Sequence, residues 1–378
     1  MIKNQVRNEL LQTNEKVGFE NFSRISHRKN VYADYGTMAK LAICGSLENE
    51  KIEKFEVRFL PAENADELAG NIRELEELAP FGKTKESVYY VLHFTKSADA
   101  ITLEGRFLKR RKECRHRELR DKLEKQAMAI EGLRDKYPRY AAKVLGIDAC
   151  AQEIGCRPEV FAPVFRRLSN HTSRAEGNVE VPQLRMTYHV GEDFLDVVDG
   201  LRAVDEAVHF LNLKCGSRIG HGTVLGIPVR KWYQKKRNTI VLSRQDYLDN
   251  IVWMYHKINE FHIEGCSELL EFLRQEFDEA FYLVYRRNID MKEVRRIWEE
   301  RAEVYHQHKY GMQEYQPSFD IFSYYASWKL RGDDPSLYSH GYYQESFFHL
   351  ERMRKMVNME YPKPFEIRKQ YDVSILYY

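Results

Sequence analysis

Three short stretches of the chain carry side chains that could do chemistry together. His189 and Glu192 lie in TYHVGEDF (187–194), His221 lies in SRIGHG (217–222), and Asp333 and Asp334 lie in LRGDDPSLYS (330–339). Imidazole nitrogens and carboxylate oxygens bind divalent metals such as zinc, and a glutamate outside the ligand set can move protons to and from a metal-bound water. These residue types together indicate metal-dependent hydrolysis.

Taken singly, each stretch also has an ordinary structural explanation. A lone histidine at the end of a strand is usually a hydrogen-bonded core or surface residue, and Asp-Asp-Pro is usually a turn or a helix cap. The chemical interpretation therefore depends on all three stretches occurring in one chain.

The elements around these stretches alternate between short apolar runs and longer amphipathic ones. Residues that alternate with a period of two predict strands, and apolar residues at helical spacing predict helices. The predicted strands are KFEVRFLP (54–61), SVYYVLHFTK (87–96), AAKVLGIDA (141–149), LRMTYH (184–189), SRIGH (217–221) and NTIVLS (238–243). The predicted helices between them cover residues 65–79, 113–137, 158–168 and 193–213.

Strands that alternate with helices at this spacing predict an α/β fold with a parallel sheet, in a barrel or a doubly wound arrangement. In a (β/α) barrel the carboxyl ends of the strands form the active site, so residues far apart in the sequence converge there. Residues 245–320 do not show this alternation of strands and helices. Their apolar residues recur mostly at helical spacing, and the segment is rich in aromatic residues. We expect them to form a helical insertion that packs on the main domain or on another subunit.

Composition limits the possible partners and compartments. The chain has 378 residues, 43% of them hydrophobic, so it can bury a sizeable core. Its 59 basic and 57 acidic residues leave a formal charge of +2, which gives no field that attracts nucleic acid or an acidic membrane. The six cysteines show neither zinc-ribbon nor disulfide spacing, which favours free thiols and a cytoplasmic location. No segment has the roughly 20 apolar residues that span a bilayer, so we expect no membrane partner.

The ordered set HVGE, RIGHG and GDDP resembles the adenosine and AMP deaminase family of metal-dependent hydrolases, whose motifs are HAGE, R/LGHG and TDDP. FEVRFLP is similar to the family's second barrel strand, and VLGIDACAQE is similar to its fourth, which has a GxD-x-x-x-x-E pattern. The resemblance covers residues from about 20 to 345. It implies a TIM-type (β/α)8 barrel that deaminates adenosine or an adenine nucleotide to the inosine product with Zn²⁺.

The resemblance also implies a role for each residue of the three stretches. His189 and Asp333 would bind zinc, and Glu192 would carry a proton to the purine ring. His221 would orient the attacking hydroxide, while Asp334 and Gly191 would contact the purine. The backbone N–H near Ala151 resembles another position that contacts the base. If the substrate were a nucleotide, the basic run KRRKECRHRELR (109–120) or Lys96 could meet its phosphates.

The chain departs from the family at the first barrel strand. That strand ends in HxH and supplies two zinc ligands, but no pair of histidines upstream of His189 has this spacing. The expected fold is therefore a barrel that lacks its first strand, with the helical insertion before its last strand. The corresponding ranges are 1–244 for the first part of the barrel, 245–320 for the insertion, and 321–378 for the last strand and a C-terminal helical segment.

Three explanations of the missing HxH stay open. A second polypeptide could supply the strand, a substitute ligand such as His93 could complete a weak metal site, or the barrel could be a non-catalytic scaffold or assembly subunit. The large helical additions and the missing strand are also similar to the bacterial deaminase of the anti-phage RADAR defence system, which forms a multi-subunit shell. That similarity implies a homo-oligomer with a role in antiviral defence.

Overall fold

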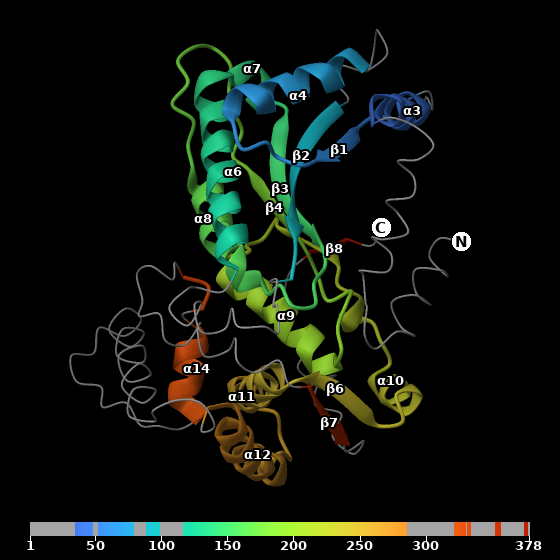
Figure 1. The fold of residues 1–378 in the computed structure, drawn as a ribbon, viewed down its shortest axis with the longest axis vertical. Coiled ribbons are helices and arrows are strands. Elements are labelled where there is room, and N and C mark those ends of the chain that lie inside the picture. The colour runs from blue at the N-terminus through green and yellow to red at the C-terminus, as the bar shows by residue number, and fades with distance from the viewer. Residues whose placement is uncertain are drawn as a thin grey trace, which may run out of the picture.

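The computed structural model describes residues 35–47, 52–78, 88–98, 116–285, 321–329, 331–333, 352–356 and 374–376. It is mixed α/β, as the alternation of patterns predicts (Figure 1). The strands are β1 (Phe55–Phe59), β2 (Val88–Lys96), β3 (Val144–Ala151), β4 (Arg185–Val190), β5 (Arg218–His221), β6 (Thr239–Ser243), β7 (Arg352–Met356) and β8 (Ser374–Leu376).

One described helix, α3, precedes β1, and the others lie in the connections between these strands and in the region beyond β6. They are α3 (Tyr35–Leu47), α4 (Ala65–Leu78), α6 (Arg117–Lys136), α7 (Pro138–Ala141), α8 (Ala162–Asn170), α9 (Val197–Phe210), α10 (Val229–Lys235), α11 (Arg244–Glu260), α12 (Ser267–Tyr285) and α14 (Ile321–Lys329). Two short 3₁₀ turns, η3 (Pro158–Val160) and η4 (Thr223–Leu225), follow β3 and β5.

Strands β1 to β5 lie side by side in chain order in one parallel sheet, and β8 adds a sixth strand beside β5. The sheet is strongly curled, because Arg218 on β5 lies 3.2 Å from Glu56 on β1. In a flat sheet these two strands would be four spacings, roughly 19 Å, apart, which is farther than two side chains reach. Strands β1 to β5 therefore form a half-barrel.

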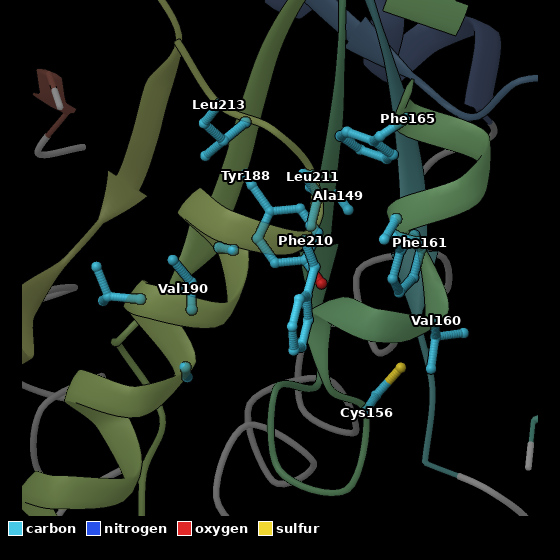
Figure 2. Packing of buried hydrophobic residues seen from close by; sticks show 14 of the residues in the cluster. Ala149, Cys156, Val160, Phe161, Phe165, Tyr188, Val190, Phe210, Leu211 and Leu213 are labelled. Carbon is cyan, nitrogen blue, oxygen red and sulfur yellow. The ribbon is translucent and has the colours of Figure 1, made fainter. Parts of the chain in front are cut away.

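The two faces of the half-barrel differ in chemistry because side chains alternate along each strand. Tyr90, Phe94 and Tyr188 point outward into the apolar core beneath the helices. In Figure 2 the ring of Tyr188 lies among Phe161 and Phe165, with ring centroids 5.9 and 5.7 Å away. The inward face instead carries Glu56, Arg58, His93, Asp148, Thr187, His189 and Arg218, which bond to one another.

Two expectations about the later part of the chain are wrong. The residues before Asp333, expected as the last barrel strand, form the helix α14. Beyond residue 334 the structure describes only the strands β7 and β8, so the expected C-terminal helical segment falls on residues outside the described ranges. Strand β6 pairs antiparallel with β7 instead of continuing the parallel sheet, because β8 occupies the edge of β5.

The helical region after β6 and the cysteines can also be compared with the predictions within the described residues. Helices α11 and α12 form the first part of the region expected to be helical, and residues 286–320 lie outside the described ranges. Cys44, Cys150, Cys156, Cys215 and Cys266 are all free thiols, and Cys114 lies outside those ranges. Among the helices described, none combines the length and apolarity needed to cross a bilayer.

Candidate functional site

The ends of β4 and β5 bring three of the predicted residues together. His189 lies on β4, Glu192 follows that strand, and His221 ends β5. Glu192 Oε2 lies 3.2 Å from His221 Nε2, and the rings of His189 and His221 have centroids 5.2 Å apart. Both partners of the Glu192–His221 contact are nearly buried, so a proton can pass between them with little competition from bulk water.

Backbone geometry fixes this arrangement. Gly191 has a φ of 75°, and a Cβ there would come within 2.7 Å of Val224, so the turn that presents Glu192 requires glycine. The carbonyl of Gly191 accepts hydrogen bonds of 2.8 Å from both the backbone N–H of Val224 and the hydroxyl of Thr223. The loop after β4 is therefore tied to the turn after β5.

Glu153 holds the same loop from the other side. Its buried carboxylate accepts hydrogen bonds from three consecutive backbone N–H groups, those of Gly191 at 2.7 Å, Glu192 at 3.1 Å and Asp193 at 3.2 Å. An anion that accepts several backbone N–H bonds orders the segment that donates them. Because the N–H of Gly191 already donates to Glu153, its predicted contact with a purine would have to use another part of the residue.

Asp148 on β3 is the centre of the inward-facing cluster. Its Oδ1 bonds His189 Nδ1 at 2.9 Å, and its Oδ2 bonds both His93 Nδ1 at 3.0 Å and Arg58 Nη1 at 2.7 Å. Burial alone would raise the pKa of Asp148, but the hydrogen bonds from His189 and His93 outweigh it and hold that pKa below its usual range. A fully buried carboxylate thus stays ionised by bonding three partners.

The environment of His189 favours the neutral imidazole. Burial lowers the pKa of His189, and the hydrogen bond to Asp148 opposes that shift without cancelling it. An ionised carboxylate at Nδ1 places the ring proton there, so the lone pair of the neutral ring is on Nε2. Gly220 makes room for this ring, since a Cβ at Gly220 would come within 2.7 Å of it.

Two further residues join the cluster from the neighbouring strands. Cys150 Sγ on β3 contacts His93 Nε2 on β2, and Ala151 after it has a left-handed φ of 76°. Lys96 is buried at the end of β2, where its ammonium donates to the carbonyl of His189 and lies 4.4 Å from the ring centre of Tyr188. The ammonium of Lys96 thus binds the backbone of β4 and is buried. This placement does not favour the expected contact between Lys96 and substrate phosphates.

Asp333 does not lie with His189. Its carboxylate pairs with Arg166 of α8 at 2.9 Å, and Gly332 before it lies against Phe210, the last residue of α9. Arg331 anchors the same segment through two bonds of 2.6 and 2.7 Å to the buried carboxylate of Asp249 on α11. Asp334 lies outside the described residues, so its expected contact with a purine has no structural counterpart here.

The residues present do not fit the expected zinc site. The two predicted ligands, His189 and Asp333, are held apart by separate ion-pair networks. Across the part of the chain that the structure describes, no group of three or more His, Cys, Asp or Glu side chains is arranged to hold a metal ion. His93, which one of the three open explanations names as a substitute ligand, bonds Asp148 and Cys150.

Sequence reasoning did not assign roles to Asp148, Glu153, Arg58 or Cys150. Asp148 and Glu153 are the two fixed acidic positions of the GxD-x-x-x-x-E pattern, so a signal for them was present in the sequence. An aspartate inside an apolar strand is itself a signal, because such a charge is buried only when it is paired. Arg58 and Cys150 gave no comparable signal, since each depends on a contact between different strands.

A scan against protein-family models found no family that matches this chain, and a search of curated proteins found no match either.

Proposed function

We propose that this chain carries the proton-transfer half of a hydrolytic centre that deaminates adenosine or an adenine nucleotide to the inosine product. The observation that carries the proposal is the 3.2 Å contact between Glu192 and His221 at the adjoining ends of β4 and β5. The order of the HVGE, RIGHG and GDDP motifs supplies the substrate class. Full closure of the half-barrel into a (β/α)8 barrel is part of the same proposal.

In hydrolytic deamination, water adds to the purine carbon that bears the amine, a ring nitrogen gains a proton, and ammonia leaves. Glu192 is the group that delivers the proton, and His221 is the group that orients the water and exchanges the proton with Glu192. Glu153 fixes the loop of Glu192. Asp148 fixes the ring of His189 beside His221.

We include zinc in the proposal because the sequence resembles zinc-dependent deaminases. Because the described residues do not assemble a zinc site, its ligands have to be completed from elsewhere, and we propose that a second polypeptide supplies a first strand with HxH. The proposed assembly is a cytoplasmic homo-oligomer with a role in antiviral defence.

The test measures conversion of adenosine and of AMP by the purified chain with added zinc, through loss of adenosine absorbance and release of ammonia. The assay is run with the chain alone and with a peptide carrying an HxH strand in trans. Glu192→Gln removes the proton donor with little change of shape. Glu180→Gln, at an exposed position, is the matched control.

We expect turnover that Glu192→Gln abolishes and Glu180→Gln preserves. A folded chain that releases no ammonia under either condition contradicts the enzymatic proposal. That outcome favours the alternative, a non-catalytic assembly subunit, for which light scattering should show the same oligomer with and without Glu192→Gln.

A further inference from the structure

Three side chains of the inward face are connected in series. Cys150 Sγ contacts His93 Nε2, and His93 Nδ1 lies 3.0 Å from Asp148 Oδ2. A nucleophile bonded to an imidazole, which is in turn oriented by a carboxylate, is the arrangement that activates thiols and hydroxyls for attack on electrophilic carbon. We propose that Cys150 is a nucleophile, with His93 as its general base and Asp148 as the residue that positions His93.

The strands create this arrangement. Asp148 and Cys150 are two residues apart on β3, so both point to the inward face. On the neighbouring β2, His93 is the register partner of Asp148, which places its ring between the carboxylate and the thiol. The arrangement therefore depends on the pairing of β2 with β3 and not on a mobile loop.

The backbone at Cys150 supports a site rather than ordinary packing. Ala151, directly after the cysteine, has a φ of 76°, which is unfavourable for a residue with a Cβ. Backbone strain of this kind persists where the surrounding structure holds it, and it is concentrated at functional positions. The turn at Ala151 ends β3 directly after Cys150, and Cys150 itself is only partly buried.

The charge environment shows why a base is needed. Burial, and then the carboxylate of Asp148, raise the pKa of the Cys150 thiol to about 12. At neutral pH the sulfur is therefore protonated, and it differs from cysteines that react because they are already thiolates. Its reactivity has to come from removal of the proton during attack, which is the role of His93.

The proposed reaction of the Cys150 thiol can be written in full for iodoacetamide, the probe used here. The sulfur of Cys150 forms a bond to the methylene carbon, the carbon–iodine bond breaks, and iodide leaves. The proton of the thiol passes to His93 Nε2, and Asp148 stabilises the resulting imidazolium through Nδ1. No oxidant, reductant or metal takes part in this step.

The experiment measures the rate of alkylation of each cysteine by peptide mass spectrometry in the full chain. Cys215 is exposed and Cys156 is buried, so they provide internal references within one molecule. We expect Cys150 to react at least as fast as Cys215 although it is less accessible. Cys150 reacting as slowly as Cys156 overturns the proposal without any variant.

The variant His93→Gln gives the second measurement. It should slow alkylation of Cys150 by at least about 100-fold, the usual contribution of a general base, and leave Cys215 unchanged. An unchanged rate at Cys150 overturns the proposal, and continued slow alkylation of the buried Cys156 shows that the variant is folded. Since this readout does not involve adenosine, the result is independent of whether the chain deaminates.

Discussion

The carboxylate of Asp148 bonds Nδ1 of His189 at 2.9 Å and so fixes the orientation of an imidazole that lies on the neighbouring strand. The same carboxylate is the buried partner of Arg58, at 2.7 Å. One residue therefore sets both the geometry of the candidate site and the charge balance of the inward face.

Replacing Asp148 by Asn should destabilise the protein, because Arg58 loses one of its two anionic partners in a mostly buried position and keeps only Glu56. Breaking a fully buried ion pair typically costs 3–5 kcal/mol, and the partial exposure of Arg58 reduces the expected loss in the free energy of unfolding to about 2 kcal/mol. Urea denaturation measures it. The exposed Asp278→Asn is the control and should change stability by less than about 0.5 kcal/mol.

Replacing Glu153 by Gln should loosen the loop that carries Glu192. The amide keeps one oxygen and presents an NH₂ group to backbone N–H donors, so at least one of the three hydrogen bonds is lost. A lost bond of about 1.4 kcal/mol corresponds to roughly tenfold faster amide exchange at Gly191, Glu192 and Asp193. Hydrogen-exchange mass spectrometry checks this, with Glu180→Gln as the control; equal protection in both variants would show that Glu153 does not hold the loop.

Adding a methyl group at Gly220 should displace the ring of His189, since the new Cβ would lie 2.7 Å from it. Overpacking of this kind costs about 1–3 kcal/mol. Gly226→Ala adds the same methyl group where the nearest atom is 3.7 Å away, so thermal unfolding should separate the two variants. A Gly220→Ala protein as stable as Gly226→Ala would mean that the ring can move aside freely.

Asp196 should make stability depend on pH. It is buried beside Tyr233, whose hydroxyl donates to it at 2.7 Å, and burial raises its pKa to about 7. In the unfolded chain an aspartate has a pKa of about 4, so between about pH 4 and pH 7 only the folded state holds this proton. Its contribution to the free energy of unfolding therefore falls as pH rises through that window and is constant above it.

The variant Asp196→Asn tests that sign, because it keeps the partner of Tyr233 and removes the ionisation. The difference in unfolding free energy between the variant and the parent should grow with pH up to about 7 and amount to a few kcal/mol, since one pKa unit corresponds to about 1.4 kcal/mol. Asp278→Asn should show no such trend. A difference that is flat with pH contradicts a protonated Asp196.

The helices and strands that could be predicted are those whose own sequence shows a strand or helix pattern. Strands β1 to β5 have alternating or continuous apolar runs, and α4, α6 and α9 have clear helical periods. The aromatic run IFSYYASWK of α14 has no such period, and it is helical because Tyr324, Trp328 and their neighbours pack on α9 and α11. That packing comes from residues more than 60 positions away, which local patterns do not record.

Some contacts of the candidate site could likewise be predicted from the sequence, and others could not. His189, Glu192 and His221 lie at or just after the ends of adjacent parallel strands, so their proximity is a consequence of the order of the strands alone. The position of Asp333 depends on Arg166 of α8, Asp249 of α11 and Arg331 of the turn after α14, charged residues whose pairing only the tertiary structure determines. The Cys150–His93 contact likewise depends on the register between β2 and β3.

The bridge between Glu56 and Arg218 has a consequence for folding kinetics. The two residues are 162 positions apart in the sequence, and the bridge forms only when four intervening strand pairings have bent the sheet. Contacts of such long sequence separation slow folding, because the entropy of a large loop is lost before the contact is gained. Curling of the half-barrel should accordingly be a late event, and Glu56→Gln should accelerate unfolding while leaving the refolding rate nearly unchanged.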